Sequence, residues 1–249
     1  LFVHMNFSTP PFDNPLVRQA VAHASPTEQI IANAYFGQAT DWQGVVPSGY
    51  PGFHLSETQY PYDPDKAAAL LAEAGYPGGE GLDAFADAFQ LSYVAEKETT
   101  LGPIVNALQT SLRSLGIPAS LNPLPQTQYG DRQLVKRDLP FAVNDQEKPI
   151  GVDAGYAIQL FFMTADKGGL NNMVNYSSDL VDDTWAKARV EQDASARDAM
   201  LATIQDQLMA DVVWAPVVEY KTQWAYSDSL KGLQWHADGS IRFFDLSFE

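Results

Sequence analysis

Residues 60–77 read YPYDPDKAAALLAEAGYP, and this stretch predicts a helix with clear limits. Asp63 precedes Pro64, a pair typical of a helix start because aspartate can accept a backbone hydrogen bond and proline suits the first turn. Gly75 marks the end, since glycine readily adopts the conformation that stops a helix. Between these limits, apolar side chains recur at helical spacing on one face, at positions 67, 70, 71 and 74.

Helical spacing recurs along the chain and alternates with short strand-like segments. Pro15 opens one helix, and Ser25 with Glu28 has the pattern of a capping box for the next. Further helices are predicted over 97–115, 129–134, 157–163, 179–192 and 196–210, and strands over 1–8, 84–94, 117–121, 212–226 and 244–248. This order predicts an α/β or α+β fold in which helices flank a mixed sheet.

The composition excludes several classes of protein. The 249-residue chain carries 15 Lys and Arg against 31 Asp and Glu, a formal net charge of −16. Such an acidic chain is a poor partner for nucleic acid phosphates or an anionic membrane surface. A hydrophobic content of 45% is enough for a packed core. Cysteine is absent, which excludes disulfides, thiolate nucleophiles and cysteine-bound metals.

Both ends of the chain have strand-like alternation that runs to the last residue. Leu1, Val3, Met5 and Phe7 alternate with Phe2, His4, Asn6 and Ser8, and Phe244, Leu246 and Phe248 alternate at the other end. Terminal strands need neighbours, so we expect the chain to be part of a longer polypeptide. The alternative is a domain whose terminal strands pair inside its own sheet.

The motifs of metal, nucleotide and serine chemistry are missing from the sequence. The four histidines, at positions 4, 23, 54 and 236, are scattered without the spacing of a metal-binding pair. The glycine-rich segment 75–81 follows a helix and lacks the Lys-Ser/Thr of a phosphate loop. No G-x-S-x-G elbow is present. We therefore expect neither a metal nor a cofactor.

Two irregular stretches, 38–62 and 144–156, carry the candidate binding residues. Asp153 could pair with a ligand ammonium, with Tyr156, Trp42 and Tyr50 as aromatic surface beside it. The structural alternatives are core packing for Tyr156 and a helix N-cap for Asp153, and both roles can coexist. A hydrolase is the rival interpretation, because two of Asp145, Glu147 and Asp153 could act as a general acid and base.

The order of these segments resembles the C-terminal half of family 5 extracellular solute-binding proteins, which are receptors of ABC importers for peptides, nickel and opines. The matching blocks are PFDNPLVRQA at 11–20, YPYDPDKA at 60–67 and LLAEAGYP at 70–77, followed by Tyr176-Ser177 with Val181-Asp182, Trp214-Ala215-Pro216 and Lys231-Gly232-Leu233. The resemblance spans essentially the whole chain.

The resemblance implies a lobe of the type II periplasmic-binding-protein fold. It assigns residues 13–221 to the C-terminal substrate-binding lobe, and 1–12 and 222–249 to strands that cross toward a first lobe. Such a receptor captures a small solute, without chemistry, in an interlobe cleft and delivers it to the transmembrane subunits of an ABC permease. Its implied location is the periplasm, free or lipid-anchored outside the cytoplasmic membrane.

The peptide-binding pattern of the family is incomplete in this sequence. Peptide receptors carry a Trp and then D-x-x-D-P before an apolar helix, whereas Asn144-Asp145 stands at the Trp position here. By this resemblance Asp153 is the best match for the acid that holds an ammonium group, and Glu147 is the second. The departures leave a peptide, an opine or an oligosaccharide as the solute.

Overall fold

The computed structural model describes residues 1–145, 153–221, 223–234, 236 and 241–248. Its helices are α1 (Pro15–His23), α2 (Thr27–Ala34), α3 (Pro64–Glu73), α4 (Glu98–Ser114), α5 (Gln126–Gly130), α6 (Ala154–Ala157), α7 (Asp179–Ala188) and α8 (Ala194–Ala210). Its strands are β1 (Phe2–Met5), β2 (Ala39–Asp41), β3 (Gln90–Val94), β4 (Ser120–Leu124), β5 (Phe141–Asn144), β6 (Trp214–Pro216), β7 (Val218–Tyr220), β8 (Leu230–Lys231) and β9 (Ser247–Phe248).

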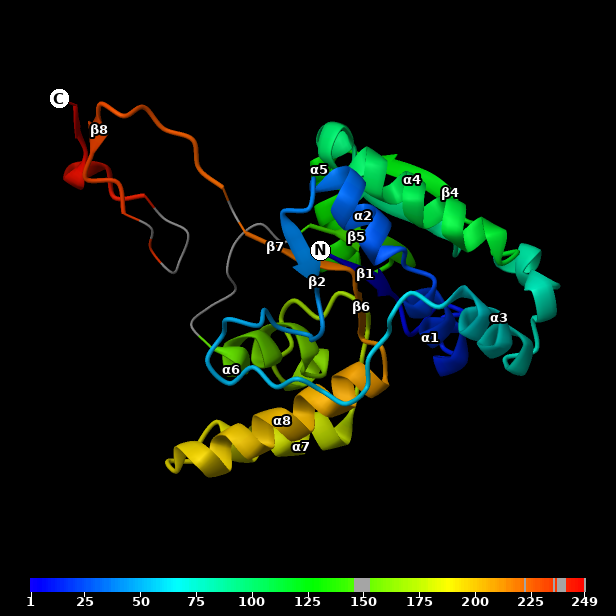
Figure 1. Ribbon diagram of the computed structural model, residues 1–249. Coiled ribbons are helices and arrows are strands. Elements are labelled where there is room, and N and C mark those ends of the chain that lie inside the picture. Colours follow the sequence, from blue (N-terminus) through cyan, green and yellow to red (C-terminus); the bar gives the residue numbers. More distant parts are fainter. Residues whose placement is uncertain (146–152, 222, 235, 237–240, 249) are drawn as a thin grey trace.

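The main sheet is mixed, as the sequence predicts, with the strand order β4-β3-β5-β1-β6. Strand β3 pairs in parallel with β4 and β5, whereas β1 runs antiparallel to both β5 and β6. Two small antiparallel pairs, β2 with β7 and β8 with β9, complete the strands. Strand β1 thus lies inside this sheet, between β5 and β6 (Figure 1).

Strand β1 separates two hydrophobic cores. Val3 and Met5 face the core that α1, α2, α3 and α4 cover, whereas Phe2 faces the core of α6, α7 and α8. The Phe2 ring stacks on Trp214 at a centroid distance of 3.9 Å and an interplanar angle of 13°. Successive side chains of a strand point to opposite faces, so an interior strand buries both of its faces. The alternating side chains of β1 therefore serve two cores.

The helices form two layers on this sheet. In Figure 1, α7 and α8 lie side by side at the bottom of the view. Helices α1 and α3 pack together at the right of the view. The predicted helix over 63–75 is confirmed as α3, and the Asp63 side chain accepts from Lys66 N at 2.9 Å as its N-cap. Apolar burial on one stripe, here Ala67 and Leu71, is what holds such a helix against a core.

Two of the predicted strands begin later in the structure than the sequence pattern indicated. The 84–94 prediction covers a 3₁₀ turn at Leu82–Phe85 before β3, because this Asp- and Ala-rich segment closes turns such as Ala88 N to Phe85 O at 2.8 Å. The strand expected at 117–121 begins only at Ser120. Gly116, with φ of 78°, and the bond from Ile117 N to Leu112 O at 3.2 Å still belong to the helix exit.

Three further local predictions are corrected. The capping box of Ser25 and Glu28 does not form: α2 has no side-chain cap, and Ser25 Oγ donates to Val21 O at 3.5 Å. The helix expected at 129–134 begins at Gln126 and continues as a π-helix to Lys136. At the chain end, Phe243–Asp245 is a 3₁₀ turn and only Ser247–Phe248 pairs as a strand.

Arg18 connects α1 to the segments at Phe12 and Asp211. It is buried and donates to Phe12 O and Asp211 O, both at 2.8 Å, and its guanidinium lies 3.9 Å from the Phe7 ring centroid. Burial lowers the pKa of this guanidinium, and Asp211 acts in the opposite direction. Its hydrogen bonds to carbonyl groups offset part of the desolvation cost of the charge.

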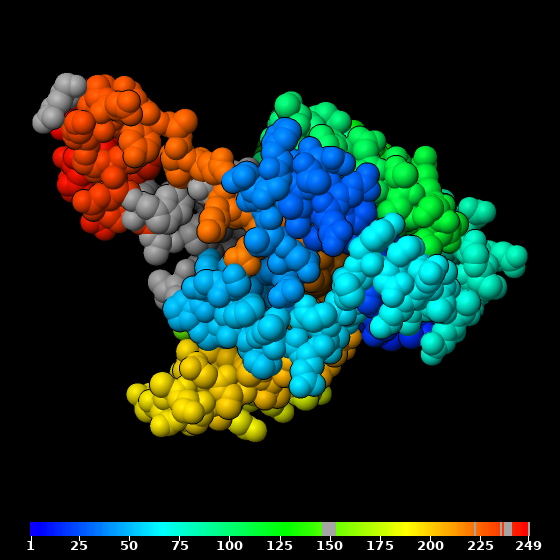
Figure 2. Space-filling model, in the orientation of Figure 1, coloured from blue at the N-terminus to red at the C-terminus, as the bar shows by residue number. Residues whose placement is uncertain are grey.

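The last residues form an arm that leaves the body after β7. Figure 2 shows the orange and red segment as a protrusion beside the blue and green body. The arm holds the β8–β9 pair and exposes large apolar side chains, with Phe244 at 82%. None of the helices in the described ranges combines the length and apolarity that a membrane crossing requires.

A buried polar chain crosses the sheet at β1 and β5. His4 is fully buried, and its Nδ1 lies 2.7 Å from Asn144 Nδ2. The Asn144 Oδ1 in turn accepts from Gln133 Nε2. Burial lowers the pKa of His4 from 6.5 to about 4, and a backbone contact at Leu139 acts in the opposite direction. The folded protein therefore holds this imidazole in its neutral form at neutral pH.

We predict that His4 makes the fold acid-sensitive. Because the pKa of His4 is lower in the folded chain, its contribution is complete above pH 6.5 and is lost as the pH falls toward 4. The full loss amounts to about 3 kcal/mol of unfolding free energy. Urea unfolding between pH 7 and 4 measures it, with His4→Gln as the comparison. Carboxylates titrate in both proteins, so equal pH slopes would contradict the prediction.

Candidate functional site

Four strands of the main sheet end at one edge. Since β4, β3, β5 and β6 all run in the same direction, the carboxyl ends at Leu124, Val94, Asn144 and Pro216 face the same side, and only β1 begins there. In open α/β sheets, ligands bind outside the carboxyl ends of strands. A ligand site is therefore expected at this edge of the sheet.

Side chains that follow β3 and β5, together with the end of β7, meet at Asp145. Its Oδ2 lies 3.3 Å from Lys97 Nζ, which follows β3, and its Oδ1 accepts from the hydroxyl of Tyr220 at the end of β7. Tyr220 also stacks on Tyr35, with ring centroids 5.2 Å apart and an interplanar angle of 23°. Three segments distant in the sequence thus form one cluster, which we call the Asp145 cluster (Lys97, Asp145, Tyr220 and Tyr35).

A cavity of about 590 Å³ opens beside the Asp145 cluster. Its lining comes from the end of α2, the start of α4 and the strand β7, including Tyr35, Phe36, Leu101, Asp145 and Tyr220. Burial raises the pKa of Tyr35, and the Asp145 charge acts in the same direction. The phenol therefore stays protonated and can donate a hydrogen bond. A concave, largely apolar site with a few polar groups is typical of small-molecule binding.

The predicted binding residue Asp153 is not part of the Asp145 cluster and lies at the start of α6. One of its oxygens accepts from Tyr156 N at 2.9 Å and caps α6, and the other pairs with Arg197 Nη2 at 2.8 Å. The expected N-cap role is thus confirmed, and the carboxylate already has a cationic partner within the chain. Tyr156 is half exposed beside it. Glu147 lies outside the described residues.

The loop 38–62 places Trp42 and Tyr50 against the second core. Trp42 is buried, its Nε1 donates to Val46 O at 3.1 Å, and its ring meets Phe2 edge-on at 5.7 Å. Tyr50 is half-buried against the same core, and the neighbouring Pro51 O accepts from Ala154 N at 2.9 Å. The structure therefore brings this loop to the start of α6, with Trp42 as a packing residue there.

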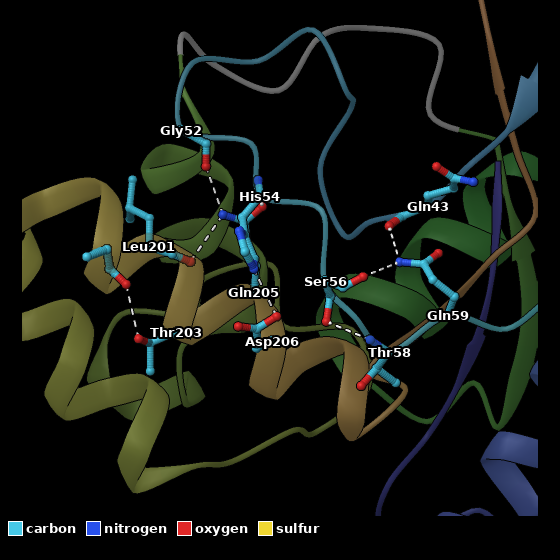
Figure 3. A network of polar contacts seen from close by, with 11 residues as sticks. Gln43, Gly52, His54, Ser56, Thr58, Gln59, Leu201, Thr203, Gln205 and Asp206 are labelled. Atoms are coloured by element: carbon cyan, nitrogen blue, oxygen red, sulfur yellow. Dashed lines mark hydrogen bonds and ion pairs between the residues drawn. The ribbon is translucent and has the colours of Figure 1, made fainter. Parts of the chain in front are cut away.

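Gln205 of α8 fastens this loop, as Figure 3 shows. Its Nε2 donates to Gly52 O at 2.8 Å, and its Oε1 accepts from His54 N at 3.0 Å. His54 also pairs with Asp206 at 3.1 Å through its Nε2. Farther along the loop, Gln59 Nε2 donates to Gln43 O and Ser56 O. A buried amide that serves two backbone groups holds a long irregular segment in one conformation.

Sequence reasoning named Asp145 but missed its partners. Tyr35 ends a helix, Tyr220 lies in a segment read only as strand material, and Lys97 was read only as the start of a helix. The order of the strands in the sheet would have been needed to find these partners, because it brings them close to the edge where the strands end. Within the described ranges, no three His, Cys, Asp or Glu side chains gather in a group that could hold a metal ion.

Comparison with known proteins agrees with this architecture. The model of the bacterial extracellular solute-binding proteins, family 5 Middle, matches residues 1–167. The chain belongs to this family. The glutathione-binding protein GsiB of Escherichia coli (strain K12) and that of Shigella dysenteriae serotype 1 (strain Sd197) are each 28% identical over the whole chain, which covers 48% of either protein. The chain thus spans about half the length of the curated relatives it matches.

Solved structures share the fold of this family member. The dipeptide binding protein from pseudoalteromonas sp. SM9913, in complex with Met-Leu, superimposes with a TM-score of 0.85 at 20% identity over all of this chain and 48% of that one. MoaA from A.tumefacien R10, in complex with mannopinic acid, gives 0.80 at 24% identity over all of this chain and 49% of that one. These similarities confirm the predicted type II periplasmic-binding-protein fold.

We predict that Gln205 is needed to hold the loop 38–62 on α8. Gln205→Ala should lower the unfolding free energy by about 2 kcal/mol, because it leaves the half-buried Gly52 O and His54 N without this partner. Thr203→Ala is the matched control on the same helix, since Thr203 is exposed and bonds only its own helix at Ala199 O. It should change stability by less than about 0.5 kcal/mol. Equal losses in urea unfolding would contradict the assignment.

Proposed function

We propose that this family member forms the C-terminal half of a two-lobed receptor, which captures a small solute and delivers it to an ABC permease. The observation that carries the proposal is the cavity of about 590 Å³ at the edge where four strands end. Such a position leaves the solute accessible to a second lobe that closes over it. The proposed location is the periplasm, or the outer face of the cytoplasmic membrane through a lipid anchor.

The solute class that we propose is a peptide, an opine or a sugar-like compound. The compounds that the similar proteins bind support this range: glutathione for GsiB, Met-Leu for the dipeptide binding protein and mannopinic acid for MoaA. All three are small compounds that combine charged groups with a compact body. The walls of the cavity, which mix aromatic rings with a carboxylate and hydroxyls, suit this kind of solute.

We also propose that residues 222–249 cross to the first lobe. In support, the described part of this arm stands off the body (Figure 2) and exposes Phe243, Phe244 and Phe248. Large apolar side chains clustered on a surface mark an interaction site. A lobe from the other half of a receptor, about as long as this chain, would cover them.

Binding is favoured over the rival hydrolase by the partners of the carboxylates. A general acid and base need a pair of carboxyl groups that share one cleft. Asp145 instead pairs with Lys97 and Tyr220, whereas Asp153 pairs with Arg197 and caps α6. Each of these two acids therefore already has a structural task.

The proposal predicts a bound solute and no turnover. Native mass spectrometry of the full-length protein, purified gently from its own cells, should find an adduct of small-molecule mass that leaves on denaturation. The released compound should return unchanged after incubation with the protein. A protein that stays empty with the compounds of its own cell extract, or that converts them, would contradict the receptor function.

Substitution of single carboxylates tests which of the two acids contributes to solute binding. Asp145→Asn should weaken solute binding about tenfold, because it removes the charge that pairs with Lys97 and weakens the hydrogen bond that holds Tyr220 in the wall of the cavity. Asp153→Asn is the matched control; it loses the ion pair to Arg197 and lowers stability by about 1–3 kcal/mol while binding changes little. Isothermal titration with the released solute measures both. The opposite order of losses would favour Asp153 as the partner of a solute ammonium.

A further inference from the structure

One residue at the mouth of the cavity has an unusual backbone and an unusual exposure. Phe36 follows the end of α2 with φ of 51°, and 83% of it is exposed. A left-handed conformation after a helix is normally left to glycine, because a Cβ disfavours it. Here Gly37, with φ of 77°, stands one position later. The chain thus holds a large apolar ring in solvent, in a conformation that such a residue rarely adopts.

The surroundings of Phe36 are apolar and aromatic. It lines the cavity together with Ala34, Tyr35, Leu101, Pro103 and Tyr220. The rings of Tyr35 and Tyr220 stack on each other, with their centroids 5.2 Å apart. Phe36 is in no ring pair among the described residues, so both faces of its ring can take a partner.

The charges around the cavity argue against a cationic group as that partner. Asp145 is the sole carboxylate among the described residues that line it, and its two oxygens are engaged by Tyr220 and by Lys97, at 3.3 Å for the lysine. Lys221 adds a positive charge to the lining. A ligand ammonium would have to compete with Lys97 for the same carboxylate, whereas an uncharged ring displaces only water from apolar walls.

We propose that this cavity receives an aromatic or other apolar side group of the solute, and that Phe36 is the ring against which it packs. The inference rests on the proposed receptor function and narrows the solute to compounds that carry such a group. Phe36 is then a specificity-determining residue, and its strained backbone keeps the ring at the mouth before the solute arrives.

Small probes test the pocket on the full-length protein without knowledge of the solute. Saturation-transfer NMR would compare p-cresol as the ring, n-butylammonium as the cation and glucose as the sugar. We expect p-cresol to bind, with Phe36→Gly weakening it about tenfold and Phe36→Tyr, which keeps the ring, changing it less than about twofold. Thermal unfolding should occur at the same or a higher temperature in Phe36→Gly, since glycine relieves the backbone and little packing is lost.

The outcomes separate this inference from the receptor function. If Phe36→Gly leaves the binding of p-cresol unchanged, the pocket assignment is wrong. It is also wrong if the binding of n-butylammonium or glucose depends on Phe36 more than that of p-cresol does. If Phe36→Gly weakens all three probes equally, the ring does not select for an apolar group and the assignment also fails. A native-mass adduct found alongside either result leaves the receptor function standing. An empty receptor whose p-cresol binding depends on Phe36 overturns the receptor function and the solute role of the pocket together.

Discussion

The packing of β1 between β5 and β6 is the constraint on which the rest of the structure depends. Its successive side chains enter different cores: Val3 and Met5 join the helices α1 to α4, and Phe2 stacks on Trp214 against α6 to α8. A strand that serves both layers must keep its register, because a shift by one residue would exchange the two sets of side chains. The central strand therefore fixes the helical layers relative to each other.

The direction of β1 also shapes the candidate site. Because β1 is antiparallel to both neighbours, β5 and β6 run in the same direction and end at the same edge as β3 and β4. Residues that follow those ends then approach each other, which is how Lys97, Asp145 and Tyr220 come together. The site is thus a consequence of the sheet order, and the helices α2 and α4 supply its walls.

The irregular loop 38–62 needs a different explanation, since it has few backbone partners of its own. Side chains on the neighbouring helix replace them: Gln205 serves Gly52 and His54, while Trp42 buries its ring under Phe2. The sequence identified 38–62 as an irregular stretch that carries candidate binding residues. Its anchor could not be identified, because a glutamine on a helix has the same pattern whether it faces solvent or a loop carbonyl.

Local patterns by themselves determined the helix α3 with its Asp63 cap, the alternating class and the alternation of Leu1 to Ser8, because spacing and capping act between near neighbours. Family motifs in the sequence added the fold and named Asp153 as the candidate acid, whereas Asp145 was a candidate only for the rival hydrolase. Only the tertiary structure decided that Asp145 meets Tyr220 and Lys97, whereas Asp153 meets Arg197. These contacts join residues dozens of positions apart, and the order of strands in a sheet leaves no periodic trace in the sequence.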